Sequence, residues 1–101
     1  MLNQTVLVGR LSKLHPKNNM FILLCQRLDG KGPVTDSDGD YIVDSIPIKV
    51  APTVFESIVK HAIEGDLIGV KGFVSAHTVS TVVIFGVKIS LLSRKEAKDL
   101  E

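Results

Sequence analysis

The sequence predicts an all-β domain with one helix, and three observations lead to that prediction. The chain has 101 residues, a length that suits a single hydrophobic core, and 45% of them are apolar. The apolar residues are mostly Val, Ile and Leu, and β-branched side chains favour strands. Five strand-like runs surround one helix-like segment, in the order β-β-β-α-β-β.

The first three strands precede the helix. Gly9 interrupts the first of them and predicts the bend or bulge that a tightly curved sheet needs. Pro47 lies in the third and cannot donate a ladder hydrogen bond, so its nitrogen is expected at an unpaired edge or a bulge. The predicted segments are a strand over 4–14, a turn over 15–19, a strand over 20–27, a long loop over 28–40 and a strand over 41–50.

Residues 53–64 have the pattern of an amphipathic helix. Thr53 and Glu56 have the spacing of a capping box, and Gly65 occupies the position that commonly ends a helix. Glu56 and Lys60 are four residues apart on the polar side. The predicted apolar face consists of Val54, Phe55, Ile58, Val59, Ala62 and Ile63.

The last two strands are predicted over 67–76 and 82–92. Three strands, a helix and two more strands form the arrangement of a five-stranded Greek-key OB-fold barrel. We therefore expect one domain over 1–92, followed by a charged, flexible tail over 93–101 in which Leu100 and Glu101 are candidate cloning remnants. The glycines expected to permit sharp coiling are Gly9, Gly69, Gly72 and Gly86.

The sequence also indicates the cellular setting. Cys25 is the only cysteine, so no intrachain disulfide forms, and its apolar neighbours predict a buried thiol. No apolar stretch approaches the length of a membrane span, and the N-terminus lacks the pattern of a secretory signal. A cytoplasmic protein without a membrane partner is expected.

No motif indicates catalysis, a cofactor or a metal site. Asp36, Asp38 and Asp40 resemble a calcium loop, but the glycine and the final glutamate that such a loop requires are misplaced, which favours turn chemistry. The histidines at 15, 61 and 77 lack metal-ligand spacing and are interpreted as surface residues. We therefore predict that the protein is not an enzyme and needs no cofactor.

What remains is a binding surface for a nucleic acid. Single strands are bound by basic side chains that contact phosphates and by aromatic rings on which bases stack. The net charge of +1 argues weakly against this, although a neutral total can hide a one-sided distribution. The alternative for each ring is a place in the core, and for each lysine a solvated outer face. The residues assigned to DNA binding are Arg10, Lys13, Lys17, Phe21, Arg27, Lys31, Tyr41, Lys49, Lys71, Phe73 and Lys88, and Phe85 is a further available ring.

Three segments resemble bacterial single-stranded DNA-binding proteins. Residues 1–11, MLNQTVLVGRL, are similar to the opening strand of that family. Residues 63–73, IEGDLIGVKGF, resemble its helix end and fourth strand, and residues 87–92, VKISLL, resemble its last strand. With the matching order of elements, the resemblance covers residues 1–92.

The resemblance implies sequence-independent binding of single-stranded DNA in replication, recombination or repair. It further implies a cytoplasmic homodimer formed through the first strand, with tetramers as a further assembly, and contacts with replication proteins. Arg10, Lys13 and Lys49 correspond to backbone contacts by position, and Lys71 and Phe73 to groove residues.

The chain departs from that family in three ways. It has no Trp, the loop over 77–81 is short, and residues 94–99 are mixed in charge where members of the family carry an acidic tip. A short barrel without tryptophan also resembles the dimeric primosomal replication protein of the same superfamily, whose motif is similar to residues 72–77, GFVSAH. An adaptor that bridges replication proteins and binds DNA weakly is therefore the alternative function.

Overall fold

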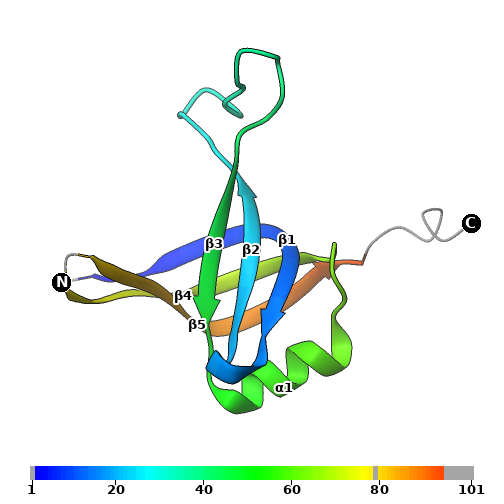
Figure 1. Cartoon of the computed structure of the whole chain (residues 1–101), viewed down its shortest axis with the longest axis vertical. Coiled ribbons are helices and arrows are strands. Elements are labelled where there is room, and N and C mark those ends of the chain that lie inside the picture. Colours follow the sequence, from blue (N-terminus) through cyan, green and yellow to red (C-terminus); the bar gives the residue numbers. More distant parts are fainter. Residues whose placement is uncertain (1, 79, 95–101) are drawn as a thin grey trace, which may run out of the picture.

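The computed structural model describes residues 2–78 and 80–94, which form a closed five-stranded barrel with one helix (Figure 1). The strands follow one another around the barrel in the order β1-β2-β3-β5-β4, and β4 closes it against β1. The predicted fold class is confirmed, and the strand bounds differ from the predicted ones by at most two residues. The elements are β1 (Thr5–His15), a short 3-10 helix η1 (Pro16–Asn18), β2 (Met20–Gln26), β3 (Val43–Lys49), α1 (Pro52–His61), β4 (Leu67–Thr78) and β5 (Thr81–Ser93).

The barrel closes because β1 has two partners. Its first half, from Thr5 to Arg10, pairs antiparallel with β4, and its second half, from Arg10 to His15, pairs antiparallel with β2. Gly9 lies where the strand passes from one partner to the other, and a Cβ there would collide with the carbonyl oxygen of Leu24. Glycine is therefore required at position 9 by the close approach of the two backbones, and the irregularity in β1 lies further on, between Leu11 and Leu14.

The second closure joins β3 to β5 and is much shorter. Only Ile48↔Ile84 and Lys49↔Phe85 pair, and they are parallel. Pro47 lies just before this pair, on a part of β3 that has β2 on one side and no β5 partner on the other. This position agrees with the unpaired edge expected for a residue without an N–H group.

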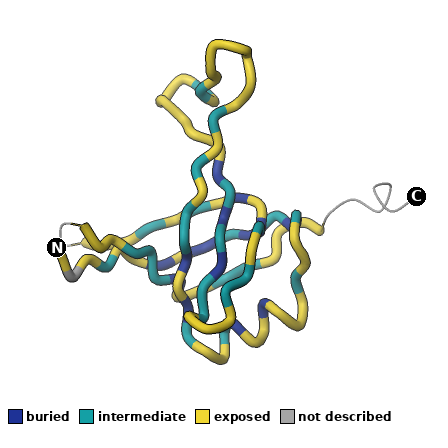
Figure 2. Tube along the Cα trace, in the orientation of Figure 1, coloured by how far each residue is buried: buried dark blue, intermediate teal, exposed yellow. Residues whose placement is uncertain are grey.

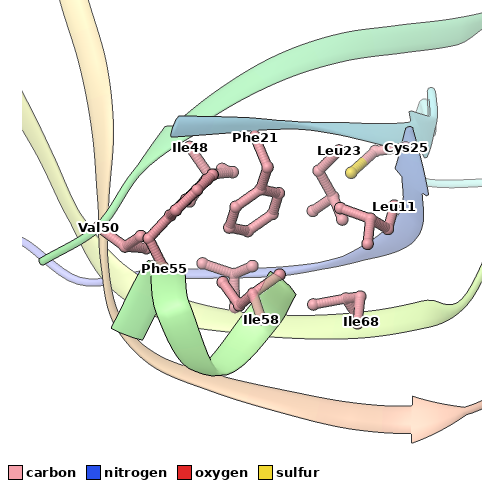
Figure 3. Packing of buried hydrophobic residues seen from close by; sticks show 10 residues of the cluster. Leu11, Phe21, Leu23, Cys25, Ile48, Val50, Phe55, Ile58 and Ile68 are labelled. Carbon is pink, nitrogen blue, oxygen red and sulfur yellow. The ribbon is translucent and has the colours of Figure 1, made fainter. Parts of the chain in front are cut away.

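The core lies inside the barrel and against α1, and Figure 3 shows its side chains converging from all sides. Buried residues lie in the barrel, on the inner side of α1 and in the turn after it, while most residues of the long β2–β3 connection are exposed (Figure 2). Cys25 is a buried free thiol, as predicted, and its pKa is raised by burial and by the nearby charge of Asp44. The core residues are Leu11, Phe21, Leu23, Cys25, Ile48, Val50, Phe55, Ile58, Ile68 and Val70.

The start of α1 differs from the prediction. The helix begins at Pro52 with Ala51 as its N-cap, and no side chain caps it, so the capping box of Thr53 and Glu56 is wrong. Proline at the first helical position has a φ suited to the helix and lacks only an N–H that would have no helical partner. Thr53 therefore lies inside the first turn, where it has no capping role.

The apolar face of α1 is also narrower than predicted. Phe55 and Ile58 are buried, whereas Val59 is 52% and Ile63 57% exposed. Because α1 crosses one end of the barrel (Figure 1), only a narrow stripe of the helix reaches the core. Val59 lies beside that stripe, and Ile63 lies beyond the end of the helix.

The helix ends at His61, before the predicted Glu64, because the next backbone groups bond elsewhere. Ala62 is extended, and the N–H of Ile63 donates to the carboxylate of Asp66 at 3.0 Å. The N–H of Gly65 donates to the carbonyl of Leu11 at 2.8 Å, and the N–H of Leu11 donates to that of Asp66 at 2.9 Å. Asp66 is fully buried. This turn therefore joins α1 to the middle of β1.

The predicted loop over 28–40 belongs to an arm, residues 27–42, that extends from the barrel end opposite α1 (Figure 1). We call it the β2–β3 arm. The bridges Leu28↔Pro33 and Thr35↔Tyr41 divide it into two tight turns. In the second turn the Asp36 carboxylate accepts hydrogen bonds from the N–H groups of Asp38 and Asp40. These contacts are turn chemistry of the kind predicted for the three aspartates.

In the part of the chain that the structure describes, no group of three or more metal-ligating side chains is close enough to hold an ion. Over those same residues, no helix combines the length and apolar character that crossing a membrane requires. Of the predicted tail, Ser93 is the last residue of β5, and residues 95–101 lie outside the described residues.

Replacing Asp66 with alanine is expected to lower the free energy of unfolding by about 1–3 kcal/mol, because the N–H of Ile63 loses its buried acceptor. Urea denaturation of the wild type and of Asp66→Ala measures the difference. Glu64→Ala, at an exposed neighbour in the same turn, is the matched control and should be nearly neutral. Equal stability of Asp66→Ala and wild type would contradict the role of this turn.

Candidate nucleic-acid interface

Acidic side chains are almost absent from the strands of the barrel. β1, β2, β4 and β5 contain no Asp or Glu, and β3 contains only Asp44. The other described acidic residues lie in the β2–β3 arm, in α1 or in the turn after it. The near-neutral total therefore hides a one-sided distribution. The basic residues on the strands are Arg10, Lys13, Lys49, Lys71 and Lys88.

A row of outward side chains crosses four strands at the carboxyl end of β3. Met20 pairs with Lys49, Lys49 with Phe85, and Phe85 with Phe73. Lys49 and Phe73 are exposed, while Met20 and Phe85 are half-buried. We call these four residues the aromatic row. It places one cation beside two rings on an open surface, which are the two components of a single-strand binding site.

The two rings of the aromatic row stack on each other. The centroids of Phe73 and Phe85 are 5.4 Å apart and their planes differ by 21°. The adjacent pair, Gly72 and Gly86, allows this approach, because a Cβ on Gly72 would collide with the backbone carbonyl of Phe85. Phe73 remains 37% exposed, so the stacked pair presents one composite surface to a ligand.

Arg10 lies on a second, parallel row. It pairs with Leu24 of β2, which pairs with Ser45 of β3, and its side chain is exposed. The Nη1 of Arg10 donates to the carbonyl of Gly65 at 3.2 Å. Among residues 2–78 and 80–94 no carboxylate pairs with this guanidinium, and the bond to Gly65 orients it on the outer surface of β1.

Arg27, in contrast, is already paired. Its Nη2 donates to Oδ1 of Asp44 at 2.6 Å and its Nε donates to Oδ2 at 3.3 Å. The hydrogen bond from Arg27 lowers the pKa of the Asp44 carboxyl, the positive charge adds to this, and desolvation opposes it. A phosphate would have to compete with this carboxylate for Arg27.

Lys71 and Lys88 are cross-strand partners on β4 and β5 next to the aromatic row, whereas four other assigned residues lie apart from it. Lys13 is at the irregularity in β1 beside the end of α1, and Lys17 is in η1. Lys31 and Tyr41 belong to the β2–β3 arm, where Tyr41 is 58% exposed. The structure therefore unites Lys49 and Phe73 in one row and leaves these four residues outside it.

Phe21 is wrong as a stacking residue. Its ring is fully buried and points into the barrel between β2 and α1 (Figure 3). Phe85, and not Phe21, is the second ring on the outer surface beside Phe73. The signal for Phe85 was present in the hairpin register, because residues at similar distances from the β4–β5 turn face each other, as Phe73 and Phe85 do.

Solved structures resemble this fold over nearly the whole chain. The mitochondrial single-stranded DNA-binding protein Rim1 of S. cerevisiae matches 94% of this chain and 99% of its own, with a TM-score of 0.69 and 16% identity. A second crystal form of Rim1 matches with a TM-score of 0.66 and 14% identity. The chain has an OB-fold. The resemblance to single-stranded DNA-binding proteins that the sequence indicated is confirmed at the level of the fold.

The OB-fold does not by itself determine the ligand. An OBody, AM3L09, bound to hen egg-white lysozyme matches 91% of this chain and 83% of its own, with a TM-score of 0.56 and 21% identity. A scan against protein-family models and a search of curated proteins find no match. The function of this OB-fold therefore has to be argued from its own surface.

The Arg27–Asp44 pair predicts a pH dependence. Asp44 has a lowered pKa in the folded state, so the pair stabilises the fold above the unfolded pKa and the contribution is lost as pH falls through the folded value. Replacing Arg27 with Gln is expected to raise the pKa of Asp44, as measured by NMR titration of its carboxyl carbon. Lys31→Gln, in the same arm, should leave it unchanged. An unaltered pKa in Arg27→Gln would show that the ion pair does not persist in solution.

Proposed function

We propose that this protein binds single-stranded DNA without sequence preference and acts by binding, not by catalysis. The observation that supports this most is the aromatic row, in which Lys49 lies beside the stacked rings of Phe85 and Phe73. A base can stack on an exposed ring whatever its identity, because every base has a π-face. A phosphate can meet Lys49 on a surface whose strands carry almost no acidic groups.

The row contains few groups that could read a base edge. Met20, Phe73 and Phe85 have no hydrogen-bonding group suited to base discrimination, and Lys49 is a point charge. Contacts of this kind favour binding that ignores sequence. Replication, recombination or repair are the processes in which such a protein would act, and the cytoplasm is its proposed compartment.

We further propose a homodimer formed along β1. From Thr5 to Gly9 this strand pairs with β4 on one side, and no other strand among residues 2–78 and 80–94 pairs with its opposite edge. Val6 and Val8 on the same stretch are 66% and 51% exposed. An unpaired edge with apolar side chains favours pairing with a second copy of the chain. A tetramer would need a second surface.

A protein adaptor is the second candidate function, and the surface of α1 favours it. Val59 and Ile63 are more than half exposed. Val59 lines a groove of about 520 Å³ that runs between Pro16 and the helix. This surface is separate from the aromatic row. It offers apolar area to a partner protein such as a replication factor.

Binding to an oligo(dT) 35-mer, measured by fluorescence anisotropy, is expected to be tight at low salt, with duplex DNA of the same length bound weakly. Phe73→Ala should weaken it by about 1–3 kcal/mol, roughly five- to 150-fold, because one stacking platform is lost. Lys49→Gln should make the slope of log K against log salt shallower by about 0.7, the value for one phosphate on a single strand.

Val59→Ala, on the far side of α1, is the control for these variants and should bind like the wild type. Absence of oligo(dT) binding at low salt would remove DNA as the ligand and leave the adaptor as the function. Wild-type affinity in Phe73→Ala would mean that DNA binds elsewhere on the barrel.

The dimer is tested by light scattering. The wild type is expected to have twice the mass of one chain, and the double variant Val6→Lys/Val8→Lys the mass of one, because charges on an edge strand block pairing. Val59→Lys introduces a charge at a similarly exposed valine on α1 and should remain dimeric. A monomeric wild type would contradict the proposed interface.

A further inference from the structure

A groove of about 300 Å³ runs over the outer face of β1, β4 and β5. We call it the β1–β4–β5 groove. Gly69 lies in its floor, and the side chain of Leu92 packs close over it, since a Cβ on Gly69 would lie 3.3 Å from that side chain. Leu92 is 52% exposed although it is apolar. The lining residues that matter here are Val6, Val8, Gly69, Lys71, Lys88 and Leu92.

Two lysines face each other at one end of this groove. Lys71 and Lys88 are direct cross-strand partners, and both are exposed. Within the described residues neither forms an ion pair, and the three strands that build the face contain no acidic residue. Like charges directly opposite each other on a sheet are destabilising. An anion between them would remove that cost, so this end of the groove favours a phosphate.

The groove continues directly from the aromatic row. Lys71 and Phe73 are two residues apart on β4 and both side chains are exposed, as expected for neighbours on one face of a strand. Their partners on β5 are Lys88 and Phe85, with the irregularity at Gly72 between the two pairs. A strand of DNA leaving the stacked rings along β4 and β5 therefore meets this pair of lysines next.

A strand of DNA that left the aromatic row in the other direction would meet unfavourable charge. It leads along β2 and β3 to the β2–β3 arm, where Arg27 is neutralised by Asp44 and Lys31 is the remaining basic side chain. The acidic residues of the arm are Asp29, Asp36, Asp38 and Asp40. Negative charge of this density repels a phosphate backbone.

We propose that the β1–β4–β5 groove is a second segment of the DNA path, in which Lys71 and Lys88 hold a phosphate and the apolar walls cover the adjoining base. This inference rests on the proposed function and specifies the route of the strand. The groove has the two properties that a nucleotide needs, an apolar surface and a cationic end.

A tryptophan reporter tests the route. The chain has no Trp, so a single introduced one reports only its own site. Leu92→Trp places it in the groove wall, and Val59→Trp places it at an equally exposed position on α1. Oligo(dT) is expected to quench the fluorescence of Leu92→Trp with the same Kd as anisotropy gives, and to leave that of Val59→Trp unchanged.

Charge removal provides a second, independent measurement. Lys71→Gln/Lys88→Gln is expected to make the salt slope shallower by between 0.7 and about 1.4, because one or two phosphate contacts are lost. Lys60→Gln, on the exposed side of α1, is the control and should keep the wild-type slope.

The outcomes separate this inference from the proposed function. If the wild type binds oligo(dT) but Leu92→Trp fluorescence is unchanged at saturation, the route is wrong and the function stands. If Lys71→Gln/Lys88→Gln keeps the wild-type affinity and forms larger oligomers by light scattering, the groove is a stacking surface between copies and the route is again wrong. If the wild type does not bind oligo(dT), the proposed function itself fails.

Discussion

The double pairing of β1 is the constraint on which the rest of the structure depends. One strand pairs with both β2 and β4, and Gly9, at the point where it passes from one partner to the other, has no Cβ to collide with the backbone of Leu24. This closure brings β4 and β5 around to β3, and so places Phe85 beside Lys49. It also leaves one edge of the first half of β1 without a partner among the described strands. The aromatic row and the proposed dimer edge are therefore two consequences of the double pairing of β1.

The net charge of the chain conceals how charged residues are distributed among its strands, helix and loops. The strands carry cations and almost no acids, while the described acidic residues collect in the β2–β3 arm, in α1 and in the turn that follows it. Because charge interactions near a surface weaken within about 10 Å at moderate ionic strength, this local segregation matters more to a nucleic acid than the net charge. The proposed DNA binding has no tryptophan platforms, so it would depend more on contacts with phosphates and would be sensitive to salt.

The fold was largely predictable, and the errors have clear physical causes. Period-two patterns and glycines located all five strands, since those signals are local. The helix bounds were wrong at both ends, because Pro52 starts the helix and the buried Asp66 competes for the backbone that would have continued it. The capping motifs in the sequence reveal neither the start at Pro52 nor the competition from Asp66. Val59 was misassigned because helical periodicity predicts an apolar stripe without telling how much of it the barrel end covers, and Ile63 was misassigned because the helix ends before it.

For the site, the sequence by itself determined the residue types, their alternation along each strand and the scarcity of acids on the strands. Alternation separates two faces but does not say which one lies inside a closed barrel. Phe21 and Phe73 are both strand phenylalanines, yet Phe21 is buried and Phe73 is exposed. Only the tertiary structure decided this, because the inner face is defined by barrel closure. The same closure brought Lys49 of β3 next to Phe85 of β5, a parallel pairing of distant residues that no local pattern encodes.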